Sequence, residues 1–413
     1  MEEDVPVNLT TDKGALWFLV SSAGIGGSER RIVKVATHMA DRGVFSRVNL
    51  LVNRKLRTEY ARDVELSGML NTSPVHVMTK ECLLEKCLLP DVSKIKLIKR
   101  AHPYLRDRER LYSWMLRSLS WSNLLSRLTR EDDMLHCFFG DPARNGCLFL
   151  ATQSNRRILL EITSNRLLGR VADQLSAILN GRQPRSTFYI RCVSRTVYDN
   201  LVSRLPQNFF QARNVDLDYY SGPFIDIKSE WGERPKEKVI IFPHRFIEPK
   251  NPVLFCRTIR RLLDEGRLDG WRIRLRGRGG LEDEMKGILK PYIERGTVDI
   301  RFSYELGREF AESMIFVSII VTGTTTSQSL FEAMRNGNLL VLSRTGENEE
   351  KFQHPDVFFV DLNEESLEQG LLQAVATCDS EAFQQKSNSM RAFFRQLNEK
   401  PGYVSDILRI YQC

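Results

Sequence analysis

The chain has 413 residues, of which 42% are hydrophobic and 27% charged, and its formal net charge is +8. These values are typical of globular proteins and exclude a disordered, collagenous or coiled-coil chain; the length suits two large domains. No apolar run approaches the roughly 18–20 residues that span a bilayer, and the polar, acidic N-terminus carries no signal pattern, so we expect no membrane span and no secretory signal. The eight cysteines include no C-x-x-C pair, which favours reduced thiols in a cytoplasmic protein without a metal site.

Most of the excess positive charge lies in one segment. Residues 80–130 include twelve basic and five acidic residues, a difference of +7 against +8 for the whole chain. Leucine and tryptophan are interleaved with these cations, a mixture that suits an anionic membrane surface. The alternative is an ordinary solvated helix face packed on a sheet. No nucleic-acid-binding motif accompanies the charge, so we expect no nucleic acid partner and keep peripheral attachment to a membrane as the hypothesis.

The first elements in chain order form a βαβ unit. Residues 15–22 are a short apolar run, typical of a buried strand, that ends in a glycine-rich turn. Residues 28–43 have apolar side chains at helical spacing, and residues 45–53 are the next strand. Further buried strands are predicted at 134–140, 157–164 and 186–194. We therefore predict an N-terminal Rossmann-like domain, residues 1–215, with a parallel sheet.

A second alternation of strands and helices follows a polar, proline-containing linker. Strands are predicted at 239–245, 271–280, 298–306, 316–323 and 339–343. Helices are predicted at 251–266, 281–296, 329–337 and 366–377. This pattern indicates a second Rossmann-like domain, residues 216–395, and a helical segment, residues 396–413, that crosses back to the first. The predicted fold class is α/β, with two Rossmann-like domains facing each other across a cleft.

Two cations follow the first strand of the second domain. Arg245 stands at the strand end and Lys250 at the start of the next helix. Ligands bind at the carboxyl ends of parallel strands, and a forked guanidinium beside an ammonium suits a diphosphate. A solvated basic loop is the alternative interpretation.

A hydroxyl-rich loop, residues 323–329, joins a later strand to a helix. Its sequence, Gly-Thr-Thr-Thr-Ser-Gln-Ser, offers N–H and O–H donors to phosphate oxygens at a helix N-terminus. Glu332 stands about one turn into the helix, where a carboxylate can accept hydrogen bonds from vicinal ribose hydroxyls. The alternative is that Ser329 and Glu332 form a capping box.

The turn after the first strand does not fit a nicotinamide dinucleotide. Gly24, Gly26 and Gly27 lack the third glycine of the G-x-G-x-x-G pattern. The second strand ends at Asn53, where that pattern needs an acidic residue. A dehydrogenase is therefore disfavoured.

Five motifs in this order resemble a known family. They are Gly26-Gly27-Ser28-Glu29-Arg30, Arg245 with Lys250-Asn251, Gly277-Arg278-Gly279, Ser329-Leu330-Phe331-Glu332-Ala333-Met334 with Gly337, and Gly346-Glu347-Asn348. Together they look like the GT-B-fold retaining glycosyltransferases of the large family 4 (glycosyltransferase group 1). The resemblance spans nearly the whole chain, and it is specific in the second half and loose in residues 54–215.

The resemblance implies a role for each matching residue. Arg245 and Lys250 would neutralise the departing diphosphate, and Glu332 would hold the ribose, so these three are the predicted catalytic residues. The predicted donor-binding residues are Gly26, Gly27, Gly279, Tyr304, Thr324, Thr326, Ser327, Gln328, Ser329 and Leu330, with Phe302 or Tyr304 near the base. The donor would bind to the second domain and the acceptor to the first.

Two positions depart from the family pattern. Thr324 stands where the first Glu of the Glu-(seven residues)-Glu motif is expected. The family's first-domain histidine has no counterpart near Thr163, so His136, Glu161 and Thr163 are the candidates for the acceptor or sugar side. For His136 the alternative is a satisfied core histidine.

The resemblance implies a metal-independent enzyme that needs no cofactor beyond its co-substrate. It would transfer a sugar from a nucleoside-diphosphate sugar to a hydroxyl acceptor, a glycan or a lipid-linked glycan, with retention of anomeric configuration. Two alternatives stay open. One is a catalytically weakened or non-catalytic nucleotide-sugar-binding relative, and the other is a nucleotide-sugar epimerase or hydrolase of the same fold.

Overall fold

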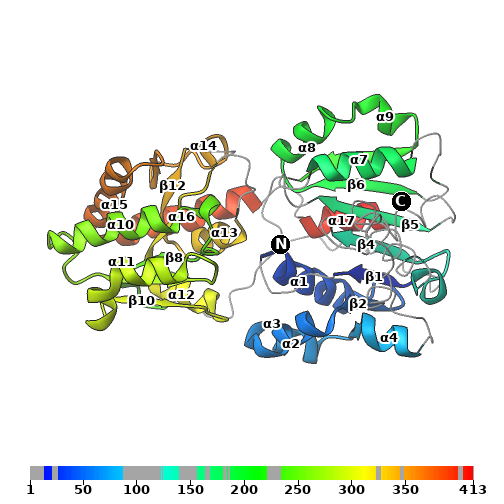
Figure 1. The fold of residues 1–413 in the computed structure, drawn as a ribbon, viewed down its shortest axis with the longest axis horizontal. Helices are drawn as coiled ribbons and strands as arrows, with labels where there is room; N and C mark the ends of the chain where they lie inside the picture. The colour runs from blue at the N-terminus through cyan, green and yellow to red at the C-terminus, as the bar shows by residue number, and fades with distance from the viewer. Residues whose placement is uncertain are drawn as a thin grey trace, which may run out of the picture. The chain divides into compact units, whose positions relative to one another are not determined.

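The computed structural model divides into two compact α/β units. The first comprises Met1–Ser221 with Ile407–Cys413, and the second Gly222–Asp406 (Figure 1). The structure describes residues 14–20, 27–86, 122, 124–138, 156–162, 168–179, 184, 187–220, 234–321, 327–344, 348–398 and 403–412. The sequence analysis placed the boundary between the domains after residue 215 and the end of the second domain at residue 395. In the structure the second unit begins at Gly222 and ends at Asp406.

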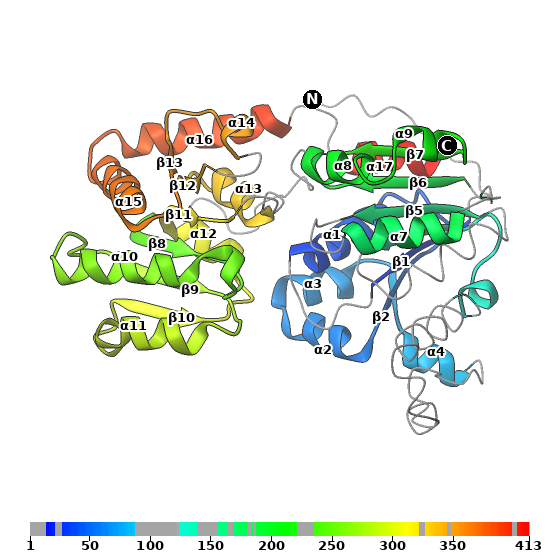
Figure 2. The same ribbon diagram turned by 45° about the horizontal axis from the view of Figure 1, so that its top comes forward.

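The first unit is built on a parallel sheet of seven strands in the order β3-β2-β1-β4-β5-β6-β7. Their bounds are β1 Leu16–Leu19, β2 Val48–Val52, β3 Val75–Thr79, β4 Met134–Phe138, β5 Arg157–Ile162, β6 Phe188–Cys192 and β7 Val215–Tyr219. Every residue of β1 and β2 is buried, because helices cover both faces of a parallel sheet (Figure 2). The order turns from one direction to the other between β1 and β4, which is the topological switch point of this sheet.

Helices surround this sheet. They include α1 Gly27–Asp41, α2 Arg54–Arg62, α3 Val64–Thr72, α4 Lys80–Lys86, α7 Leu168–Leu179, α8 Arg195–Val202, α9 Gln207–Gln211 and, in part, α17 Tyr403–Gln412. The side chains of Asn53, Asp63 and Ser194 cap α2, α3 and α8. Each accepts a hydrogen bond from the backbone N–H three residues later in the chain. From Ile407 onward α17 is part of the first unit.

The second unit has a parallel sheet of six strands in the order β10-β9-β8-β11-β12-β13. Their bounds are β8 Glu237–Phe242, β9 Arg272–Arg276, β10 Val298–Arg301, β11 Ser313–Ser318, β12 Leu339–Ser343 and β13 Val357–Val360. From the central strand β8, the strands β9 and β10 extend the sheet to one side. The next strand in the chain, β11, lies on the other side of β8 and is followed there by β12 and β13. This is the Rossmann order, with its switch point between β8 and β11.

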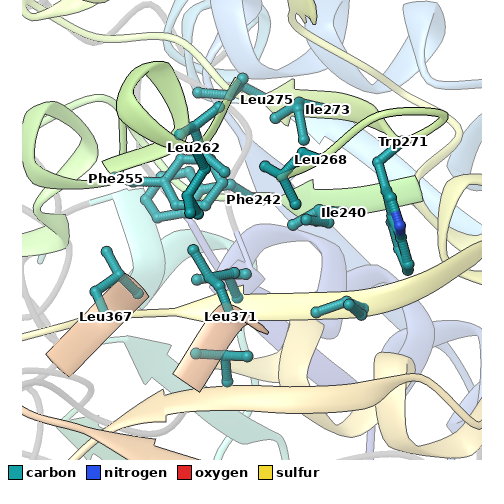
Figure 3. Packing of buried hydrophobic residues seen from close by; sticks show 14 of the residues in the cluster. Ile240, Phe242, Phe255, Leu262, Leu268, Trp271, Ile273, Leu275, Leu367 and Leu371 are labelled. Carbon is teal, nitrogen blue, oxygen red and sulfur yellow. The ribbon is translucent and has the colours of Figure 1, made fainter. Parts of the chain in front are cut away.

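The core of the second unit has one layer on each face of its sheet. The helices are α10 Pro252–Asp264, α11 Glu282–Glu294, α12 Leu306–Glu312, α13 Gln328–Arg335, α14 Asn348–Lys351, α15 Glu364–Cys378 and α16 Phe383–Asn398, with a 3-10 turn, η5, at Glu248–Lys250. On one face, Phe242 stacks on Phe255 of α10, with ring centroids 4.8 Å apart, and Leu371 of α15 lies in the same cluster (Figure 3). On the other face, Ile241 and Phe316 pack with Phe331 and Met334 of α13.

Three strands have no counterpart in the sequence-based prediction: β3, β7 and β13. Each lies at the end of its sheet, where one edge of the strand has no neighbour. β3 and β7 mix polar and apolar residues, as expected of edge strands that are exposed in part. β13, Val-Phe-Phe-Val, is a four-residue apolar run that the prediction missed. In β7 the pattern is Val-Asp-Leu-Asp-Tyr.

None of the described helices combines the length and the apolar character needed to cross a membrane.

Candidate functional site

The carboxyl ends of β8 and β11 form the switch point of the second unit. The chain leaves β8 at Phe242 and passes through Arg245 to Lys250, the last residue of η5. It leaves β11 at Ser318, and Ser327 precedes the next helix, α13. In open α/β sheets ligands bind at such an edge, between the loops that follow the two strands. The structure therefore brings the predicted cations and the start of α13 to one edge of one sheet.

Two hydrogen bonds hold the loop after β8 against the chain after β11. The Val321 N–H donates to the carbonyl of Pro249 over 3.1 Å, and Asn251 Nδ2 donates to the carbonyl of Ile319 over 2.9 Å. Asn251 adopts a left-handed conformation, with φ +49°, which Asn tolerates better than most residues. Lys250 stands between these two anchors, so its backbone is fixed beside the end of β11.

Two glycines of the loop after β9 allow that loop to pack against the loop after β8. A Cβ on Gly277 would lie 2.0 Å from the carbonyl oxygen of His244, and one on Gly279 would lie 2.2 Å from the carbonyl oxygen of Phe246. Phe246 also donates its N–H to the Arg278 carbonyl over 3.1 Å. No side chain larger than hydrogen fits at either glycine.

The two cations have no described acidic partner. Arg245 is exposed and Lys250 is half-buried. In the part of the chain that the structure describes, neither forms an ion pair with a carboxylate. Burial, and then the neighbouring charge of Arg245, lower the pKa of Lys250 to about 8. Two like charges held together without a counter-charge favour an anionic ligand.

The start of α13 differs from the capping-box alternative. The helix begins at Gln328 with Ser327 as its N-cap, so Ser329 lies inside the first turn and Glu332 is not its capping partner. Gln328, Ser329 and Glu332 are half-buried. Leu330 is buried in the core and its N–H donates to the Ser327 carbonyl over 3.1 Å, so this predicted donor-binding residue has a packing role.

An aromatic pair follows the carboxyl end of β10. The rings of Phe302 and Tyr304 meet edge to face at 4.8 Å, and the Arg278 guanidinium lies 4.5 Å from the Phe302 ring centroid. These planar groups stand at the ends of β9 and β10, on the same edge of the sheet as the cations. The arrangement suits a flat heterocycle.

Four predicted residues lie outside the described residues: Gly26, Thr163, Thr324 and Thr326. Gly27 is described only as the first residue of α1.

His136 and Glu161 are buried in the first unit. His136 Nε2 lies 3.1 Å from Glu161 Oε2, and Glu161 Oε1 accepts a hydrogen bond from Arg31 of α1. The other imidazole nitrogen of His136, Nδ1, lies 2.6 Å from the Tyr411 hydroxyl on α17. The side chains of His136 and Glu161 are 0% exposed, as the core alternative for His136 expects.

The charges of this buried network can be assigned. Burial lowers the pKa of His136, and the opposing effect of Glu161 is smaller, so the imidazole is neutral at pH 7. A neutral imidazole has one N–H, which donates to the Glu161 carboxylate, while Nδ1 accepts from Tyr411. Burial raises the pKa of Tyr411 well above its ordinary value, which keeps that hydroxyl protonated.

Sequence analysis missed three residues that the structure places in polar clusters: Arg31, His244 and Tyr411. His244 directly precedes the predicted Arg245, and this position was the one available signal. Arg31 and Tyr411 come from helices far apart in the chain, so no local pattern links them to His136.

The fold is that of the GT-B glycosyltransferases. TarM from S. aureus, in complex with UDP, alpha-GlcNAc-glycerol and fondaparinux, superposes with a TM-score of 0.68 at 10% identity, over 97% of this chain and 100% of that one. HepE from Anabaena, in complex with UDP and glucose, gives 0.63 at 12% identity, over 96% and 98%. A glycosyltransferase from Rickettsia africae gives 0.63 at 13% identity, over 97% and 98%.

Sequence comparison adds nothing to this result. No protein-family model matches the chain, and no curated protein matches it in sequence.

Proposed function

We propose that this protein is a glycosyltransferase that transfers a sugar from a nucleoside-diphosphate sugar to a hydroxyl acceptor, with retention of anomeric configuration. The observation that carries the proposal is the pair Arg245 and Lys250, two cations without a described carboxylate partner at the switch point of the second unit. A diphosphate supplies the missing negative charge, and the same cations stabilise it as the leaving group.

The surrounding groups support a nucleotide rather than a simple anion. The planar groups Arg278, Phe302 and Tyr304 suit a nucleobase, and Glu332 on α13 can accept hydrogen bonds from ribose hydroxyls. The similar structures of HepE and TarM contain UDP, so UDP-sugars are the first donors to test. In this proposal cations and backbone N–H groups stabilise the diphosphate, and the reaction needs no metal ion or cofactor.

The proposed acceptor is a glycan or a lipid-linked glycan. The TarM structure contains alpha-GlcNAc-glycerol and that of HepE contains glucose, which supports a sugar-bearing acceptor. The basic segment of residues 80–130, which lies mostly outside the described residues, is the candidate surface for an anionic lipid. Co-sedimentation with phosphatidylglycerol vesicles, against phosphatidylcholine vesicles as the control, tests that part separately.

The test of the central proposal removes each cation in turn. We expect Arg245→Ala and Lys250→Ala each to weaken nucleotide-sugar binding and to reduce transfer by roughly 10²–10³-fold, the usual cost of one electrostatic stabiliser. Arg257→Ala, an exposed position on α10, and Lys290→Ala, a 73%-exposed position on α11, are the matched controls and should change neither quantity. Unchanged binding and transfer in both site variants would refute the proposal.

Thr324 keeps a second candidate function open, that of a nucleotide-sugar-binding protein without turnover. The departure from the family motif at this position is the observation that favours it. Tight binding of a donor, with neither transfer to any acceptor nor slow donor hydrolysis, would select this alternative. Rapid release of free sugar or of an epimer would select the hydrolase or epimerase.

A further inference from the structure

We propose that His244 is a third basic group of the nucleotide-sugar site, and that its imidazole takes up one proton from solution when a diphosphate binds beside Arg245 and Lys250. The inference rests on the proposed function and adds a residue and a proton to it. Neither the predicted site nor the family motif includes this side chain.

The ring of His244 is held at the switch point. The residue is the second after the end of β8, and its side chain packs edge to face between Phe242 and Phe316, with ring centroids 4.9 Å and 6.0 Å away. Its carbonyl is fixed against Gly277, where no Cβ fits. The residue is only 6% exposed, and its ring contacts lie on β8 and β11.

One nitrogen of this buried ring has no hydrogen-bond partner in the part of the chain that the structure describes. The imidazole forms one hydrogen bond with the backbone of Val317 on β11. Nε2 is buried and has no hydrogen-bond partner among the described residues. A buried polar atom without a partner is unfavourable, and native proteins keep few of them, so its retention at a ligand-binding edge points to use by the ligand.

Lys250 of η5 is the one charged group among the described residues that shifts the pKa of this ring. Arg245 is its chain neighbour, and Glu248 is an exposed carboxylate at the start of η5. No described carboxylate is recorded as opposing the effect of Lys250 on the ring. Burial, and then the charge of Lys250, lower the pKa of His244 well below 6.5, so the free protein holds a neutral imidazole.

A bound diphosphate reverses this field. A nucleotide sugar carries two negative charges and has no group that titrates near neutral pH, so the protein must take any proton from the solvent. That proton goes to Nε2, and the resulting imidazolium adds a third positive charge beside the diphosphate. Binding should therefore be linked to proton uptake.

The experiment measures this proton directly. UDP-glucose, ADP-glucose and GDP-mannose are titrated calorimetrically at pH 6.5 in two buffers of unlike ionisation enthalpy, and the difference in heat gives the number of protons taken up. We expect the wild-type protein to approach ~1 proton per bound nucleotide sugar. Lys250 contributes little at this pH, because a pKa of about 8 leaves it almost fully protonated before binding.

Two variants and a control separate the titrating role from a packing role. His244→Asn and His244→Gln keep a hydrogen-bonding side chain but cannot titrate, so uptake should fall to near zero and the pH dependence of Kd between pH 6 and 7.5 should flatten. His354→Asn is the matched control, a half-buried histidine of the same unit that is bonded to Ser389 over 3.1 Å, and it should keep the full uptake.

The outcomes distinguish this inference from the proposed function. Binding by the wild-type protein without proton uptake, or undiminished uptake in a folded His244 variant, overturns the role of His244 and leaves the nucleotide-sugar site standing. Binding of none of the three nucleotide sugars overturns both. The wild-type measurement needs no variant, so a failure of either variant to fold does not prevent a decision.

Discussion

At the scale of single residues, the second unit contains paired and unpaired cations in the same sheet. Arg276 is buried and bonded to Glu309 and Asp299, each over 2.7 Å. Its positive charge is therefore balanced by neighbouring carboxylates and has no need of an anionic ligand. Lys250 has no described partner, and its lowered pKa records the cost of that isolation. The unpaired cation, rather than the more numerous paired ones, therefore marks the site.

The pKa of Lys250 leads to a pH dependence of binding. Because a diphosphate favours the ammonium form and the free pKa is about 8, affinity for the donor should fall as the pH rises through 8. Between pH 7 and 9 we expect Kd for UDP-glucose to increase about tenfold, as measured by calorimetry. Lys250→Arg stays charged throughout this range and should lose this part of the dependence. An equal rise in Kd for this variant would show that another group titrates.

Gly279 and its neighbour Gly280 should respond differently to substitution by alanine, because only Gly279 is packed against another loop. Gly279→Ala would place a Cβ against the Phe246 carbonyl and should destabilise the loop by about 1–3 kcal/mol and weaken donor binding. Gly280→Ala has open space around its Cβ and is the matched control, expected to change stability by less than about 0.5 kcal/mol. Urea unfolding and calorimetric Kd measure both effects. Equal behaviour of the two variants would contradict the close approach of these loops.

At the scale of elements, the last helix is held to the first unit by a polar anchor inside an apolar interface. The Tyr411 hydroxyl meets His136, and Arg157 donates to the Tyr411 carbonyl over 2.7 Å. Phe45 packs edge to face on the Tyr411 ring at 5.5 Å. A buried hydroxyl with a dedicated acceptor fixes the position of α17, because any shift would leave both groups unsatisfied.

The anchor predicts the effect of removing one oxygen atom. Tyr411→Phe leaves Nδ1 of His136 buried without a donor and should lower the free energy of unfolding by about 1–3 kcal/mol. Tyr198→Phe is the control, since the Tyr198 hydroxyl has no hydrogen bond recorded within the described residues and its ring packs on Tyr219. Thermal unfolding of the two variants tests this. If both variants match the wild-type midpoint, the hydroxyl contributes nothing to the docking of α17.

At the scale of the whole molecule, the chain has two sheets, each with its own apolar core. Among the described strands, those of one sheet form no ladder with those of the other. Units of this kind are expected to unfold in separate steps.

This organisation predicts a selective effect of the donor. A nucleotide sugar at ~100 Kd stabilises the state that binds it by about 2.7 kcal/mol. Calorimetry of the intact chain should therefore show one transition raised by ~5–10 °C and the other little changed. Lys250→Ala should abolish that shift while keeping both transitions. An equal rise in the midpoints of both transitions would mean that the donor stabilises both units and not the second alone.

The central strands were predictable because a parallel sheet buries them on both faces. Residues 48–52, Val-Asn-Leu-Leu-Val, are buried throughout and form an apolar run. The edge strands β3 and β7 were not predicted, because polar residues interrupt their apolar pattern. Arg245 and Lys250 could be proposed from the sequence because a strand end followed by a helix start is a local signal.

The sequence alone determined the α/β class, the two alternations of strand and helix, and the positions of the cations along the chain. These are properties of neighbouring residues, and local periodicity encodes them. Only the tertiary structure decided that His136 and Glu161 are buried with Arg31 and Tyr411, and that His244 packs between Phe242 and Phe316 with one nitrogen unpartnered among the described residues. The bond between Arg31 and Glu161 joins residues more than 100 positions apart in the chain. The surroundings of His244 depend on the pairing of β8 with β11. Such distant partners leave no mark on the local pattern of either segment.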